Sequence, residues 1–224
     1  MKKMILMALS LMFVGTVNAK VNGIDDGVEA VDLGLSVKWA NMNVGATKDS
    51  GFGSYFAWGE TKPKKYYSWG TYTWSQGDSN FLLKYSVNDR KVQLAPSDDA
   101  ARANWGGEWR MPTQTQMSEL KNKNYTSWKW TTINGINGYL VTSLIEGYTD
   151  KSIFFPAAGY HDRSKLNHGG EQGHYWSSTL DLDYDYAGVA YYLFFKSTGY
   201  GTGTTDRTFG RTIRPVVLIS SINK

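Results

Sequence analysis

Six short runs rich in β-branched and aromatic residues fill the second half of the chain, and they constrain the fold more than any other feature. Such runs predict strands, and the dipeptides Asn134-Gly135 and Asn137-Gly138 predict turns between them. Strands joined by short turns pair in an antiparallel manner. The runs, all beyond Tyr125, are SWKWTTI, GYLVTS, SIFFPAAG, HYWSSTL, GVAYYLFF and GRTIRPVVLI.

The first half of the chain contains weaker strand signals and a helix signal. Short strands are predicted at Val37 to Asn41 and at Tyr55 to Glu60. The sequence SDDAARANWG predicts a short helix, with Ser97 as its N-cap and the acidic Asp98 and Asp99 in its first turn. A charged first turn of this kind is the simplest explanation for the paired carboxylates.

A second helix is predicted after Pro112. Thr113 and Gln116 have the spacing of a capping box, in which each side chain binds the backbone N–H of the other residue. Met117 and Leu120 lie three residues apart and share one helical face. Two short helices followed by many strands predict an α+β domain with a mainly antiparallel sheet.

The N-terminus has the pattern of a secretory signal peptide. Lys2 and Lys3 precede an almost wholly apolar run from Met4 to Val17. Val17-Asn18-Ala19 then places small residues at the usual positions of a signal-peptide cleavage site. The run is too short to span a membrane, so we expect cleavage after Ala19 and export to the periplasm, the cell surface or the medium. No later segment is apolar enough to span a membrane. The predicted organisation is a signal at 1–19, a flexible lead-in at 20–30 and one domain at 31–218.

Composition excludes several classes of function. The chain has no cysteine, which removes disulfides, a lipid-anchoring cysteine and every thiol mechanism. Lys2 and Lys3 of the predicted signal account for half of the net charge of +4. The weak positive charge that remains on the predicted mature chain argues against a nucleic-acid-binding surface. The 9 tryptophans, 15 tyrosines and 24 glycines favour short strands and tight turns, a combination typical of exported proteins that bind sugars or proteins.

The chain resembles a known family along nearly all of the predicted domain. The matching pieces run in order from VDLGLSVKWANMNVGA, YFAWGETKPKKYYSWGTYTW and DDAARANWGGEWRMPT to FFPAAGY, HYWSSTL, AYYLFF and GRTIRPV. They resemble the exported "Fibrobacter succinogenes major paralogous" domains of gut Bacteroidetes. WRMPTQTQMSEL is also similar to a corner of the sulfatase-modifying-factor type of C-type-lectin-like domain. The resemblance implies a C-type-lectin-like fold in which Trp105 and Trp109 are core and Arg110 makes buried or half-buried hydrogen bonds.

Catalytic and metal-binding patterns fail on inspection. The thiol oxidation of the sulfatase-modifying relatives needs cysteines that this chain lacks. Asp181, Asp183 and Asp185 start like a calcium-binding EF-hand loop, but Tyr186 replaces the required glycine and Tyr192 the bidentate glutamate. The three histidines do not have the spacing of a helix-borne zinc pair: they are His161, His168 and His174. We therefore expect no cofactor, no metal and no enzymatic activity.

The leading hypothesis is a non-catalytic domain that binds a protein or glycan ligand at a cell or host surface. Relatives with a similar tail include variable proteins diversified by retroelements, whose ligand surface follows the YWSS strand. A mixture of tyrosine, aspartate and arginine suits such a surface, because rigid rings give contact area at low entropic cost. The matching outward or loop positions are Asp181, Asp183, Tyr184, Asp185, Tyr186, Phe194, Lys196, Tyr200, Thr202 and Arg207, flanked by His161, Asp162 and Arg163.

Two alternatives remain open at this point. The Tyr/Trp-rich segment 66–74 could bind carbohydrate by stacking exposed rings on sugar faces, or it could be a structural lid. A hydrolase would need two separated acids in a cleft, which the sequence does not exclude. The rings of the segment are Tyr66, Tyr67, Trp69, Tyr72 and Trp74.

Overall fold

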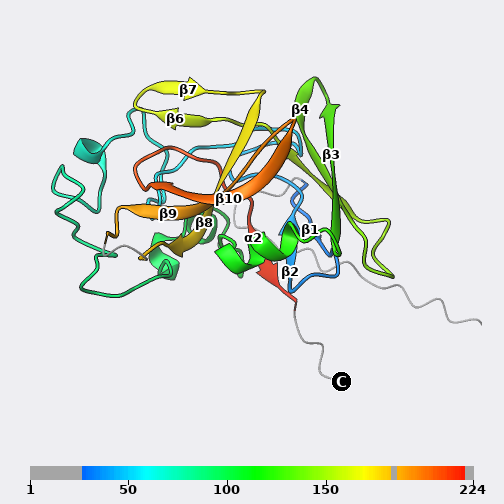
Figure 1. The fold of residues 1–224 in the computed structure, drawn as a ribbon, viewed down its shortest axis with the longest axis horizontal. Coiled ribbons are helices and arrows are strands. Elements are labelled where there is room, and N and C mark those ends of the chain that lie inside the picture. Colours follow the sequence, from blue (N-terminus) through cyan, green and yellow to red (C-terminus); the bar gives the residue numbers. More distant parts are fainter. Residues whose placement is uncertain (1–26, 183–185, 220–224) are drawn as a thin grey trace, which may run out of the picture.

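The computed structural model describes residues 27–182 and 186–219, and these residues form an α+β fold with mainly antiparallel sheets (Figure 1). The predicted signal peptide and most of the predicted lead-in lie outside the described residues. No helix within the described ranges has the length and apolar character needed to cross a membrane.

Three sheets of three strands each and one two-stranded sheet make up the β structure. All strand pairings within these sheets are antiparallel. The first sheet joins the two ends of the described chain, in the order β1 (Ala30–Val31), β2 (Val37–Ala40), β11 (Val216–Leu218). The second has the order β3 (Thr126–Ile133), β4 (Ile136–Ser143), β5 (Ser152–Pro156). The third has the order β10 (Gly199–Asp206), β9 (Val189–Lys196), β8 (Gln172–Leu180). The two-stranded sheet consists of β6 (Tyr160–Asp162) and β7 (Lys165–Asn167).

One of the two predicted turn dipeptides is confirmed and the other is wrong. Asn134 and Gly135 both adopt positive φ, at 52° and 78°, and join β3 to β4 in a tight hairpin. Asn137 and Gly138 instead lie inside β4. A Cβ at Gly138 would collide with the backbone oxygen of Phe155 on β5, so this glycine permits a close approach of strands rather than a turn.

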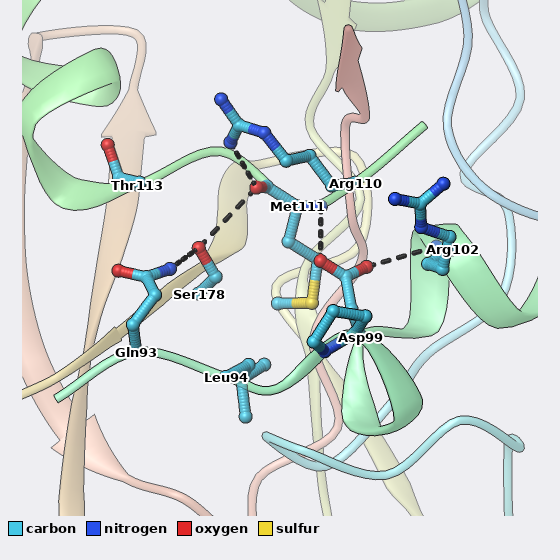
Figure 2. Close-up of a pocket in the computed structure, with 9 residues that line it drawn as sticks. Gln93, Leu94, Asp99, Arg102, Arg110, Met111, Thr113 and Ser178 are labelled. Carbon is cyan, nitrogen blue, oxygen red and sulfur yellow. Dashed lines mark hydrogen bonds between the residues drawn. The ribbon is translucent and has the colours of Figure 1, made fainter. Parts of the chain in front are cut away.

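Helix α1 (Ala100–Trp105) starts later than the sequence predicts. A 3-10 turn occupies Pro96–Asp98, and Asp99 rather than Ser97 is the N-cap. One carboxylate oxygen of Asp99 accepts from the Arg102 backbone N–H at 3.0 Å, and the other accepts from the Met111 N–H at 2.8 Å (Figure 2). Asp99 therefore caps α1 and also ties it to the segment leading into α2.

Helix α2 (Gln114–Leu120) has the predicted capping box between Thr113 and Gln116, and Met117 and Leu120 are buried as expected. The predicted strand at Tyr55 to Glu60 is reduced to a single bridge, Phe56 to Arg211.

The stretch from Asn104 to Leu120 contributes to the core. Trp105 and Trp109 are 1% and 2% exposed, and their rings meet edge to face with centroids 5.3 Å apart. They belong to one of two large apolar clusters, which also contains Trp58 and Trp176. The second cluster lies under the β8–β9–β10 sheet and includes Phe195. Packing of aromatic rings thus holds together a chain that has no disulfides.

Candidate ligand-binding face

The pairing of β8, β9 and β10 gathers one set of side chains on one face of their sheet. Phe194 pairs directly with His174 on β8 and with Gly201 on β10. Directly paired residues in antiparallel strands point to the same side, as do alternate residues along each strand. We call this set the Phe194 face; it comprises Gln172, His174, Trp176, Tyr192, Phe194, Lys196, Gly199, Gly201 and Gly203.

Phe194 is the exposed ring of this face, with 38% of its surface accessible. Its ring extends over the neighbouring strand, because a Cβ at Gly201 would be only 2.8 Å from Phe194 Cζ. A Cβ at Gly203 would be 3.5 Å from Cε1 of Phe194 and of Tyr192. The two glycines leave the space that these rings occupy, so β10 supplies a flat base for them.

The opposite side of the same sheet is core. Leu193 and Phe195 are 0% and 1% exposed, which confirms the predicted strand register. Tyr200 lies on this side, stacked on Trp128 with ring centroids 4.4 Å apart, and Thr202 pairs with Leu193. The placement of Tyr200 and Thr202 beside Phe194 is therefore wrong, since alternation along β10 points them to the other face.

Arg211 lies beneath the rings of the Phe194 face. Its Cζ is 3.8 Å from the Tyr192 ring centroid, 5.0 Å from Trp176 and 5.2 Å from Tyr160. Arg211 is 3% exposed, so its attraction to these rings acts with little screening by water. Tyr192, Trp176 and Tyr160 are thereby held by a buried cation that packs against their rings.

A histidine completes this cluster. Arg211 Nη1 and His174 Nδ1 are 2.7 Å apart, and His174 Nε2 is 3.0 Å from Gln172 Oε1. Because a guanidinium can only donate, Nδ1 accepts and the imidazole proton lies on Nε2. Burial, together with the charge of Arg211, lowers the pKa of His174 to about 3, and burial lowers the pKa of Arg211 to about 10. His174 is therefore neutral and Arg211 charged near pH 7.

Arg207 and Asp181 do not have the outward positions predicted for them. Arg207 is 0% exposed and donates to the carbonyl oxygens of Lys84, Tyr85 and Ala187. Its role is to hold three segments together, because buried carbonyl groups require donors. Asp181 is 6% exposed.

The remaining residues that were predicted to bind ligand differ in their exposure. Lys196, Asp162 and Arg163 are exposed, and Tyr186 is half-buried. His161 is also half-buried; it packs on Tyr55 at 4.6 Å and belongs to the structural surroundings of that ring. Residues Asp183, Tyr184 and Asp185 lie outside the described residues. Sequence reasoning missed His174, Tyr160 and Arg211, and no local pattern marks them, because only the strand register and the fold bring them together.

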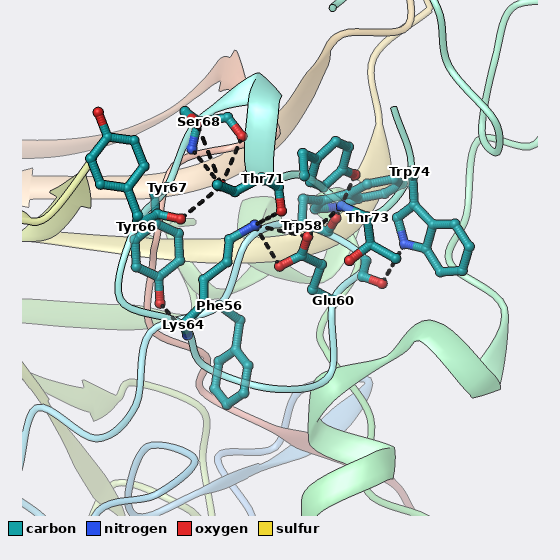
Figure 3. Close-up of polar contacts among 12 residues, drawn as sticks. Phe56, Trp58, Glu60, Lys64, Tyr66, Tyr67, Ser68, Thr71, Thr73 and Trp74 are labelled. Carbon is teal, nitrogen blue, oxygen red and sulfur yellow. Dashed lines mark hydrogen bonds and ion pairs between the residues drawn. The ribbon is translucent and has the colours of Figure 1, made fainter. Parts of the chain in front are cut away.

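The Tyr/Trp-rich segment 66–74 is mostly internal. Tyr67 and Tyr72 are 2% and 3% exposed, and their hydroxyls donate to the carbonyl oxygens of Tyr55 and Trp58 at 2.6 and 2.7 Å. Tyr66 is the exposed ring and points away from the segment (Figure 3). These contacts favour the structural-lid interpretation for most of the rings.

One groove of about 440 Å³ does lie beside this segment. The half-buried Trp74, whose Nε1 donates to the Gly59 carbonyl oxygen at 2.7 Å, forms one wall. Glu60 and Asp98 also line the groove, and each is paired with a lysine. Lys64 lies 2.8 Å from Glu60 (Figure 3), and Lys84 is in contact with Asp98. The groove thus combines an aromatic wall with two carboxyl groups that are each paired with a lysine.

Comparison with known proteins gives one match. Residues 144–216 match the family model described as Domain of unknown function (DUF8237), and this region contains every residue of the Phe194 face. No curated protein and no solved structure matches the chain. Within residues 27–182 and 186–219, no group of three or more histidine, aspartate or glutamate side chains is arranged to hold a metal ion.

Proposed function

We propose that this chain is an exported, non-catalytic binding domain on a C-type-lectin-like scaffold, which holds a protein or glycan ligand on the Phe194 face. One observation carries the proposal: Phe194 presents an exposed ring over Gly201 and Gly203, while Tyr192 beside it packs on the buried Arg211. A ring with few accessible rotamers loses little entropy on binding, and exposed aromatic anchors supply much of the energy of interfaces. The mainly antiparallel α+β architecture and the family resemblance support the scaffold.

The test compares wild-type protein with Phe194→Ala on a glycan array and in pull-downs from host and microbial surface extracts, with bound proteins identified by mass spectrometry. Wild-type protein is expected to retain a specific ligand that Phe194→Ala loses. Lys129→Gln, a change on the exposed part of β3, serves as the control and is expected to behave as wild type. A ligand held equally by Phe194→Ala contradicts the assignment of the face.

A second candidate function is carbohydrate binding in the Trp74 groove, favoured by the combination of the Trp74 ring with Glu60 and Asp98. Aromatic walls and carboxylate acceptors both suit hydroxylated ligands. Glycan binding that is lost in Trp74→Ala and kept in Phe194→Ala would favour this groove over the Phe194 face.

Hydrolysis in the same groove is disfavoured by the charge pairs. Burial by itself raises the pKa of Asp98, but hydrogen bonds from Lys84, Tyr85 and Ser97 bring that pKa below its usual value. Glu60 forms an ion pair with Lys64 at 2.8 Å. A glycosidase needs one carboxyl group that keeps its proton, and the lowered pKa of Asp98 does not favour that role for Asp98. Turnover abolished by Glu60→Gln or Asp98→Asn would contradict this argument.

A further inference from the structure

A half-open pocket of about 190 Å³ lies beside the Asn104–Leu120 stretch (Figure 2). Its lining comes from the segment before α1, from α1, from the segment that leads into α2 and from Ser178 of β8. None of its lining residues belongs to the Phe194 face or to the Trp74 groove. A protein cavity of about 150 Å³ is known to hold one benzene molecule, so this pocket has room for a single ring with a small substituent.

One part of the pocket wall is apolar. Leu94 and Met111 are 8% and 1% exposed, and Pro96 is an exposed lining residue. Contact with these side chains would remove the apolar body of a ligand from water.

Arg102 and Arg110 also line the pocket, and Figure 2 draws their guanidinium groups on opposite sides of Asp99. Arg110 uses Nη1 to donate to the Met111 carbonyl oxygen at 3.1 Å and to Gln116 Oε1 at 3.0 Å. Its Nε and Nη2 make no hydrogen bond to the described residues, and they are not among the fully buried unpartnered atoms, so they are accessible to solvent. Arg102 has an ion pair with Glu108 at 3.6 Å, but the Glu108 side chain is 76% exposed, which makes the pair weak.

Asp99 supplies the only carboxylate of the lining residues. Both of its oxygens already accept backbone N–H groups, from Arg102 and Met111. Its carboxylate therefore caps α1 and does not engage either guanidinium directly. Two arginines against one aspartate leave an excess of one positive charge, together with free guanidinium donors in a partly desolvated site.

We propose that this pocket binds a small carboxylate with an apolar body. Arg110 donates hydrogen bonds to the carboxylate, the positive charge of Arg102 across the pocket attracts it, and Leu94, Pro96 and Met111 cover the apolar part. The proposal concerns a site separate from the Phe194 face and does not rest on the proposed function.

Benzoate is the probe, because its ring and single carboxylate match the volume and the charge of the pocket. Benzamide is the matched neutral ligand, with nearly the same shape. In calorimetric titration of the purified chain, benzoate is expected to bind at one site, and benzamide about tenfold or more weakly, since loss of the charge removes the charge-assisted hydrogen bonds. No saturable benzoate binding, or equal binding of the two ligands, overturns the proposal.

Two variants locate the site. Arg102→Gln and Arg110→Gln are each expected to weaken benzoate binding about tenfold, whereas Lys129→Gln, which makes the same charge change on β3, leaves it unchanged. Arg110 also holds the backbone, so thermal melting is measured for each variant. If Arg110→Gln does not fold, Arg102→Gln decides, because the half-exposed Arg102 side chain makes only the weak ion pair with Glu108 among the described residues. Equal affinity of Arg102→Gln, Lys129→Gln and wild type overturns the proposal.

Discussion

Phe194 and Gly201 are direct partners across β9 and β10, and the ring of Phe194 fills the space that any side chain at Gly201 would need. The absence of a side chain on one strand thus sets the position of an exposed ring on the next. Glycine is used here for close approach, since the φ of Gly201 is not among the positive values.

Gly201→Ala is therefore expected to displace the Phe194 ring and weaken ligand capture. Its Cβ would meet the far end of an exposed, movable ring at 2.8 Å, so the free energy of unfolding should change by less than about 1 kcal/mol. Gly203→Ala is the matched control, because its Cβ would have ordinary contacts at 3.5 Å. Urea denaturation and a binding assay with the ligand identified for wild type check both changes. Full capture by Gly201→Ala would show that the ring position does not matter.

Phe194→Ala and Phe195→Ala are expected to have opposite effects. Phe195 is 1% exposed, so its truncation should lower the free energy of unfolding by about 3–5 kcal/mol. Phe194 is 38% exposed, so its truncation should cost about 1 kcal/mol or less and should weaken binding instead. Chemical denaturation and the same binding assay measure the two quantities. A large stability loss in Phe194→Ala would mean that this ring is core.

Acid should destabilise the protein through His174. Its pKa is lowered from 6.5 to about 3 in the folded state, first by burial and then by the charge of Arg211. Between these values the unfolded chain binds a proton that the folded chain does not, so the free energy of unfolding falls as the pH falls, by at most about 1.4 kcal/mol per pH unit.

The measurement is urea denaturation at about pH 4.5 and about pH 7, in wild type and in His174→Gln. The glutamine side chain would keep an acceptor for Arg211 but would not titrate, so the variant should lose less stability on acidification. Burial also lowers the pKa of His161, but it does so in both proteins, so the comparison removes the contribution of His161. The same pH dependence in both proteins would exclude His174 as the cause.

Trp109→Ala should destabilise the domain by about 3–5 kcal/mol, because the ring is 2% exposed and packs on Trp105 at 5.3 Å. Trp109→Phe should cost less, since Trp109 Nε1 is buried without a hydrogen-bond partner among the described residues and its loss carries no penalty. Thermal and urea unfolding compare the two variants. A Trp109→Ala protein as stable as wild type would contradict a structural role for the Asn104–Leu120 stretch.

The proposed export predicts a mature protein that begins at Lys20, because Lys2, Lys3 and the apolar run that follows have the pattern of a signal peptide ending at Ala19. Mass spectrometry of the protein recovered from outside the cytoplasm gives the N-terminus directly. Retention of Met1 to Ala19, or an attached acyl chain, would contradict the proposed route.

Patterns of neighbouring residues correctly predicted those elements that neighbouring residues alone determine. The Thr113–Gln116 capping box, the Asn134-Gly135 turn and the alternation through Leu193 and Phe195 follow from neighbouring residues, and the structure confirms them. The N-cap of α1 was wrong, because Asp99 gains a second partner at Met111 that no local pattern reveals.

The sequence by itself determined the α+β class, the strand-rich second half and which face of β9 is buried, because backbone geometry and the alternation of apolar residues act over a few residues. Only the tertiary structure decided which strands pair, and therefore that Phe194 lies beside His174 and Gly201 while Tyr200 points into the core. It also decided that Arg207 and Arg211 are buried. A charged residue favours the surface until distant carbonyl groups and rings are brought around it, and that arrangement arises only when the whole chain folds.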